Sequence, residues 1–175
     1  MGIRQVGVWK SSLTILGTGQ MGAADPKRGH KLTPRTYAND SIEVAWEPRL
    51  CIHTQNCVRG LGEVFDRDRR PWVRVDGADA DRVAATVMTC PTGALRFRRL
   101  DGGPQEEPPS ETTIEPRPDG PLFVRGRLQL IDGDGTTVRE VTRAALCRCG
   151  ASGNKPFCDN SHRKIGFKTE EHHEQ

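Results

Sequence analysis

The chain has few of the residues that build a large hydrophobic core. Of its 175 residues, 34% are hydrophobic and 5% are aromatic, and the mean hydropathy is −0.63. Small domains with so little apolar material usually need a metal site or disulfide bonds in addition to their core. The composition therefore predicts that some of the six cysteines stabilise the fold.

Long hydrophobic runs and nucleotide-binding patterns are also lacking. The apolar patch at 13–16 is shorter than the core of a signal peptide and far shorter than a membrane span. We therefore expect a cytoplasmic protein with no membrane association, in which cysteines bind metals more often than they form disulfides. We find no phosphate loop, nucleotide fingerprint or nucleophile–base arrangement, so we do not expect an enzyme.

The charge pattern gives no reason to expect a nucleic-acid partner. The formal net charge is +3 and the isoelectric point is about 8.6. Basic residues stand beside acidic ones through most of the chain, and no basic stripe is interleaved with aromatic residues.

The segment 147–162 is the most informative part of the chain. It places three thiols and one imidazole, those of Cys147, Cys149, Cys158 and His162, in a segment that glycine and proline interrupt. Thiolate and neutral imidazole are ligands for zinc and for iron. The ligand types alone leave open one tetrahedral zinc ion or an iron–sulfur cluster.

The same segment reads C-x-C-x2-S-x3-P-x-C-D-x-S-H and resembles the CDGSH-type iron–sulfur domain of the mitoNEET-like family. In that family three cysteines and one histidine hold a 2Fe–2S cluster, which implies this role for Cys147, Cys149, Cys158 and His162. The family usually has glycine where this chain has Asn160, and asparagine tolerates the left-handed conformation that glycine suggests. A histidine ligand implies a cluster that is labile in acid, because protonated imidazole leaves the metal.

The remaining three cysteines form a second set, Cys51, Cys57 and Cys90. The patterns C-x-H-x3-C at 51–57 and C-P-x-G-A-L at 90–95 resemble the divergent 4Fe–4S mono-cluster ferredoxins. A 4Fe–4S cluster ordinarily takes four cysteines. The resemblance therefore implies either a 3Fe–4S cluster or a 4Fe–4S cluster whose fourth iron is bound by a group such as His53. A hydrogen-bonding or capping role for His53 is equally open.

Together these features predict an α+β protein, with a ferredoxin-like N-terminal domain and a small β-rich CDGSH-type domain. We expect regular structure to begin near residue 41 and assign 101–119 as a linker because it is rich in proline and glutamate. The expected parts are a flexible leader at 1–35, the ferredoxin-like domain at 36–100, the linker at 101–119, and the CDGSH-type domain with a short tail at 120–175.

Alternating and helical patterns place the secondary structure within these parts. We expect a short helix after Cys51 and a helix that begins at 79–81, where acidic residues favour a helix start. The strands are expected at 42–46, 72–75, from 95 to 98, 122–124, 128–131 and 138–141, with a turn at 132–135.

The predicted function is that of an iron–sulfur protein carrying two clusters, which transfers single electrons to or from a redox partner protein. Transfer of a cluster to an apo iron–sulfur protein, redox or iron sensing, and a ferredoxin with a structural zinc module are the alternatives. The chain would also suit an auxiliary subunit of an oxidoreductase. Domains of the mitoNEET type are often dimeric, so the resemblance leaves a homodimer through the CDGSH-type domain open.

Overall fold

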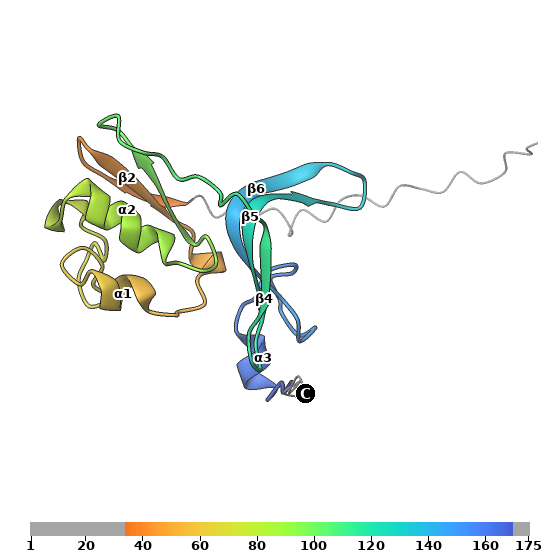
Figure 1. Cartoon of the computed structure of the whole chain (residues 1–175). Helices are drawn as coiled ribbons and strands as arrows, with labels where there is room; N and C mark the ends of the chain where they lie inside the picture. The colour runs from red at the N-terminus through yellow and green to blue at the C-terminus, as the bar shows by residue number, and fades with distance from the viewer. Residues whose placement is uncertain (1–33, 170–175) are drawn as a thin grey trace, which may run out of the picture. The chain divides into compact units, whose positions relative to one another are not determined.

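The computed structural model of the chain describes residues 34–169, which belong to one compact unit (Figure 1). The expected leader, apart from its last two residues, and the end of the expected tail lie outside the described residues. No helix in the described part is long and apolar enough to cross a membrane. We call residues 35–99 the first module and residues 113–169 the second module.

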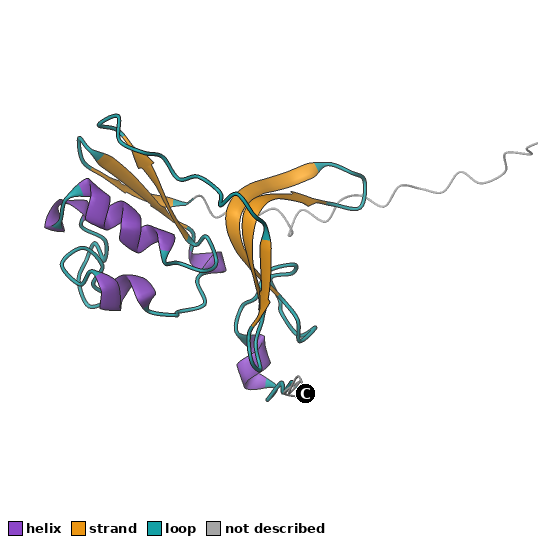
Figure 2. Cartoon of the chain, viewed as in Figure 1, coloured by secondary structure: helices purple, strands orange, loops and turns teal. Residues whose placement is uncertain are grey.

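The first module contains a three-stranded antiparallel sheet. Strands β1 (Arg35–Ala38), β2 (Ile42–Trp46) and β3 (Leu95–Arg99) follow one another in the order β1-β2-β3 (Figure 2). The expected strands at 42–46 and from 95 are confirmed. Strand β1 begins before residue 41, where we expected regular structure to start. Because its side chains are mostly exposed, it has no alternating hydrophobic pattern that could reveal it.

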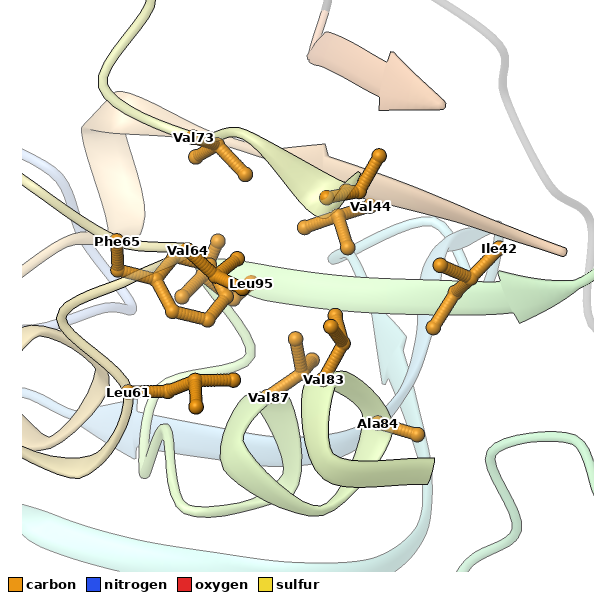
Figure 3. Close-up of a cluster of buried hydrophobic side chains, with 11 residues drawn as sticks. Ile42, Val44, Leu61, Val64, Phe65, Val73, Val83, Ala84, Val87 and Leu95 are labelled. Carbon is orange, nitrogen blue, oxygen red and sulfur yellow. The ribbon is translucent and has the colours of Figure 1, made fainter. Parts of the chain in front are cut away.

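Two α-helices, α1 (Asn56–Gly60) and α2 (Ala80–Met88), lie on one face of this sheet (Figure 1). The Asp79 carboxylate accepts a hydrogen bond from the backbone N–H of Arg82 at 2.9 Å, which confirms the expected helix start. Val83 and Val87 lie four residues apart on α2, are fully buried, and point toward the sheet (Figure 3). The hydrophobic core consists of Ile42, Val44, Leu61, Val64, Phe65, Val73, Val75, Val83, Ala84, Val87 and Leu95.

The expected strand at 72–75 is wrong. Phe65 and Val73 form a single antiparallel bridge, and residues Val75–Gly77 form the 3-10 helix η3. Another 3-10 helix of the first module, η2, spans Pro48–Leu50. Val73 and Val75 are both buried, so they alternate as strand residues do, but this segment bonds to the loop at 64–66 instead of the sheet.

The expected linker at 101–119 is not free of structure. Residues Thr113–Pro116 form strand β4, whose four side chains are all exposed. Backbone pairing with a neighbouring strand needs no apolar side chains, so the composition did not indicate this strand. Earlier in the same segment, the side chain of Glu106 is only 11% exposed.

The second module contains the sheet β4-β5-β6, with β5 at Leu122–Ile131 and β6 at Thr137–Leu146. The strands that we expected at 122–124 and 128–131 are one strand, whose register shifts between Arg125 and Leu128. The turn at 132–135 is confirmed by a backbone hydrogen bond from Gly135 to Asp132. The short helix α3 (Ser161–Lys164) follows. Helices and two antiparallel sheets confirm the α+β class.

Two arginines of β6 join the second module to the first. Arg139 donates to both carboxylate oxygens of Glu47, at 2.7 and 2.8 Å. Arg143 is 1% exposed, and its guanidinium reaches into the first module beside α2.

The two modules also approach one another closely at Gly93. The backbone of Gly93 has φ +66°, and a Cβ atom there would lie 2.7 Å from the carbonyl oxygen of Arg143. Only a glycine combines this backbone conformation with so close an approach.

Candidate metal centres

The structure brings Cys51, Cys57 and Cys90 to the wall of one cavity. Cys51 directly follows η2, Cys57 lies in α1, and Cys90 follows α2. The cavity has a volume of about 440 Å³, and its wall includes the side chains of Trp46 and Trp72. All three cysteines are half-buried and free of disulfide bonds. The first predicted set of ligands therefore shares one apolar cavity.

Two thiols of this cavity, those of Cys51 and Cys57, have raised pKa values. Burial raises the pKa of Cys51, and it raises the pKa of Cys57 to about 11. The nearby thiol of Cys90 raises both values further, so the three sulfurs are close enough to interact electrostatically. Binding of iron would therefore displace protons from these groups.

Two indole donors of the cavity wall are buried. Nε1 of Trp46 and Nε1 of Trp72 have no partner at hydrogen-bond distance among residues 34–169, although the Trp46 side chain interacts with the Cys51 thiol and opposes the rise in its pKa that burial causes. The two rings pack edge to face with their centroids 4.9 Å apart. Buried polar groups are normally satisfied, and the sulfur atoms of an iron–sulfur cluster accept hydrogen bonds. The cavity therefore fits such a cluster both in its thiols and in its unpaired donors.

His53 lines the same cavity but stands closest to one of the thiols. Its Nδ1 lies 3.8 Å from Sγ of Cys51, and its backbone has φ 57°. A left-handed residue between two candidate ligands turns the loop sharply. The His53 imidazole therefore lies at the candidate centre, beside Cys51, and both a ligand role and a hydrogen-bonding role fit this position.

The second predicted set forms two close pairs. Sγ of Cys147 lies 3.8 Å from Sγ of Cys149, just after β6, and Sγ of Cys158 lies 3.4 Å from Nδ1 of His162 in α3. Each pair has the two ligand atoms that one iron of a 2Fe–2S cluster would take from the protein. Over residues 34–169, no three His, Cys, Asp or Glu side chains form a group that could hold a metal ion as they stand.

The surroundings of the second set shift the pKa values of its ligands in different directions. Burial is the largest influence on the Cys147 thiol and raises its pKa, but hydrogen bonds, chiefly from the backbone of Ser152, outweigh it and lower the pKa overall. Burial raises the pKa of Cys158, although the backbone N–H of Asn160 donates to its sulfur at 3.4 Å. Burial and the charge of Arg163 lower the pKa of His162, which keeps the imidazole in its neutral, metal-binding form.

The other residues of the motif shape the loop. The Asp159 carboxylate accepts from the backbone N–H of Ser161 at 2.9 Å and from that of Gly153 at 2.8 Å, so it joins the start of α3 to the loop at 153. The Ser152 hydroxyl donates to the carbonyl of Phe157 at 2.6 Å. Asn160 has φ 71°, so the expected left-handed conformation is confirmed.

Some residues of these sites have no signal in the sequence. Trp46 was predicted only as a strand residue, and nothing in its pattern indicates a donor beside the cysteines. The buried Arg143 donates to the carbonyl of Cys90 at 2.8 Å, from a strand 53 residues further along the chain. Burial of an arginine is decided by tertiary packing, so no local pattern reveals it.

Two segments of the chain match known protein families, and these matches define the class of the protein. Residues 37–100 match the family described as "Divergent 4Fe-4S mono-cluster", and residues 119–163 match the family described as "Iron-binding zinc finger CDGSH type". The chain is therefore an iron–sulfur protein, and both predicted resemblances are confirmed.

A comparison with curated proteins identifies the family more closely. The chain is 41% identical over 64 residues to the protein YjdI of Escherichia coli (strain K12), and equally to YjdI of Escherichia coli O157:H7. This match covers 84% of the relative and 37% of the present chain. The chain belongs to the divergent 4Fe–4S mono-cluster family and carries a CDGSH-type domain fused to it.

Proposed function

We propose that the protein carries two iron–sulfur clusters and transfers single electrons between them and a partner protein. The observation that carries this proposal is the division of the ligand types into two separate sets. Three cysteines line one cavity, whereas three cysteines and one histidine form two close pairs in the second module. Two redox centres in one compact unit favour electron transfer over purely structural support.

The first site suits a cluster of the cubane type, held by Cys51, Cys57 and Cys90. Three thiols match the ligand count of a 3Fe–4S cluster. A 4Fe–4S cluster needs a fourth ligand, and His53, which lines the same cavity, is the candidate for it. Here the protein supplies the thiolates, a mostly apolar wall, and the two indole donors of Trp46 and Trp72.

The second site suits a 2Fe–2S cluster. Cys147 and Cys149 would bind one iron, and Cys158 and His162 would bind the other. The division of the ligand atoms into two close pairs favours this cluster over one structural zinc ion. The cluster supplies one-electron chemistry, while the protein's hydrogen bonds to Cys147 and Cys158 stabilise the thiolates.

Exposed basic residues beside the second site favour an acidic redox partner. Arg163 and Lys164 in α3 are exposed and adjoin His162. Charges of this kind steer an oppositely charged partner toward the site. All six cysteines are free of disulfide bonds, which suits a protein of the reducing cytoplasm.

The proposal is tested on anaerobically purified protein by visible absorption, electron paramagnetic resonance, and analysis of iron, sulfide and zinc. We expect two distinct cluster signals. The double variant C51S/C57S should remove one of them, and C147S/C149S should remove the other. A colourless protein loaded with zinc would refute the two-cluster proposal.

The histidine of the second set supports one further function, transfer of the 2Fe–2S cluster to an apo iron–sulfur protein. An imidazole ligand is released by protonation more readily than a thiolate. Incubation with an apo-ferredoxin tests this function, since the acceptor should gain a cluster at the rate at which this protein loses it. Retention of the cluster throughout would leave electron transfer as the function.

A further inference from the structure

The two candidate sites contact one another through Asn160 and Ile52. Asn160 stands between Cys158 and His162, and its side-chain Nδ2 donates to the backbone carbonyl of Ile52 at 2.8 Å. Ile52 is the residue between Cys51 and His53. One hydrogen bond thus joins the ligand loop of the first site to the ligand loop of the second.

Apolar packing supports this hydrogen bond. Ile52 is 5% exposed and packs in one buried cluster with Ala145 and Cys158. The candidate ligand Cys158 is therefore part of the same small core as a residue of the other ligand loop. Movement of either loop would disturb this core as well as the hydrogen bond.

Asn160 is held in place on its own side of the contact. It adopts a left-handed conformation as the residue preceding α3, and its backbone N–H donates to Sγ of Cys158 at 3.4 Å. Its Oδ1 is buried and has no partner within 34–169, so the carbonyl of Ile52 is what holds the amide. Glycine would adopt the same backbone conformation but would lack the amide.

We propose that Asn160 is a positioning residue that couples the two sites, so that a cluster in either site stabilises the ligand loop of the other. This inference rests on the proposed function, in which both sites hold clusters. A coupling of this kind is reciprocal, because a change that one bound group makes in the affinity for the other acts equally in both directions.

The test follows release of the first cluster from the full-length holoprotein to a chelator under anaerobic conditions. In the otherwise natural chain, disabling the second site with C147S/C149S should accelerate this release about fivefold, the effect of one typical hydrogen bond. In an Asn160→Gly background, the same double substitution should change the rate less than twofold. Asn154→Gly is the matched control, because Nδ2 of Asn154 also bonds to the first module, at the carbonyl of Arg49, but outside the ligand pairs.

Equal acceleration in the Asn160→Gly and natural backgrounds would overturn the proposal, and so would the absence of acceleration in the natural chain. Failure of the proposed function is detected separately: the natural protein would then contain no iron and sulfide, which is measured before any variant is compared. Hydrogen exchange of the metal-free full chain provides a readout that needs no cluster. Asn160→Gly should speed exchange of the peptide at 51–57, whereas Asn154→Gly should not, and equal exchange in both variants would also overturn the proposal.

Discussion

Replacement of Arg143 by methionine should cost the protein a large part of its stability. The guanidinium donates to the carbonyls of Val87 at 2.7 Å, Cys90 at 2.8 Å and Leu95 at 3.1 Å, and to the carboxylate of Glu106 at 3.0 Å. Methionine would fill part of the space but would leave these acceptors without their donor, including a carboxylate that is 11% exposed.

The magnitude follows from the burial of this ion pair. Removing one partner of a buried pair typically costs about 3–5 kcal/mol, because the other charge remains buried and unpaired. Natural proteins are stable by only about 5–15 kcal/mol, so the variant should lose about a fifth or more of its free energy of unfolding. With a urea dependence of about 1–3 kcal/mol per molar, a loss of ~3 kcal/mol should lower the unfolding midpoint by about 1–3 M.

Urea unfolding of the anaerobic holoprotein, followed by far-ultraviolet circular dichroism, measures this effect. Arg127→Met is the matched control, since Arg127 is an exposed arginine of the neighbouring strand β5. Adding Glu106→Gln to Arg143→Met should restore part of the loss, because the unpaired carboxylate is then gone. Equal midpoints for Arg143→Met and Arg127→Met would refute the reasoning.

Three further predictions concern the two sites and the end of the described chain. His162→Cys should slow loss of the second cluster's visible absorbance at mildly acidic pH, because a thiolate resists protonation better than imidazole; an unchanged rate would remove His162 from the ligand set. Trp46→Phe should lower the reduction potential of the first cluster in a redox titration, because the indole N–H would no longer bond to a cluster sulfur; an equal potential would show that this bond is not made. Lys168 and the backbone N–H of Thr169 lower the pKa of Asp119, so this contact should be intact above the ordinary value of about 4 and be lost as the pH falls below it. The protection factor of the Thr169 amide, which is the intrinsic exchange rate at each pH divided by the observed rate, should therefore fall in acid, whereas Asp119→Asn should show low protection already at neutral pH, and pH-independent protection would contradict this assignment.

The parts of the fold that the sequence predicted are those with a local pattern. The alternation at 42–46 and the acidic start before Val83 each reflect one face of an element packed on the core. Strands β1 and β4 were missed or assigned to a linker because their side chains are mostly exposed. What fixes them is backbone pairing with the next strand along the chain, β1 with β2 and β4 with β5, and such pairing needs no apolar side chains.

The candidate ligands could be found from sequence, but their surroundings could not. Cysteine spacing indicated two sets, and the structure places one set around a cavity and the other in two pairs. The contact between Asn160 and Ile52 joins residues 108 positions apart. The roles of Trp46 and Arg143 likewise depend on which segments are in contact in the folded chain, and a single sequence does not reveal these tertiary contacts.

The close approach at Gly93 limits how this protein could have diversified after its two modules were joined. A lone first module would require only a left-handed residue at this turn, and asparagine would be tolerated there. In the joined protein the carbonyl of Arg143 occupies the place where any side chain would begin. In the joined protein a side chain at residue 93 would therefore force the first module and the Arg143 carbonyl apart locally, so the contact between the modules adds a second requirement for glycine to that of the backbone conformation.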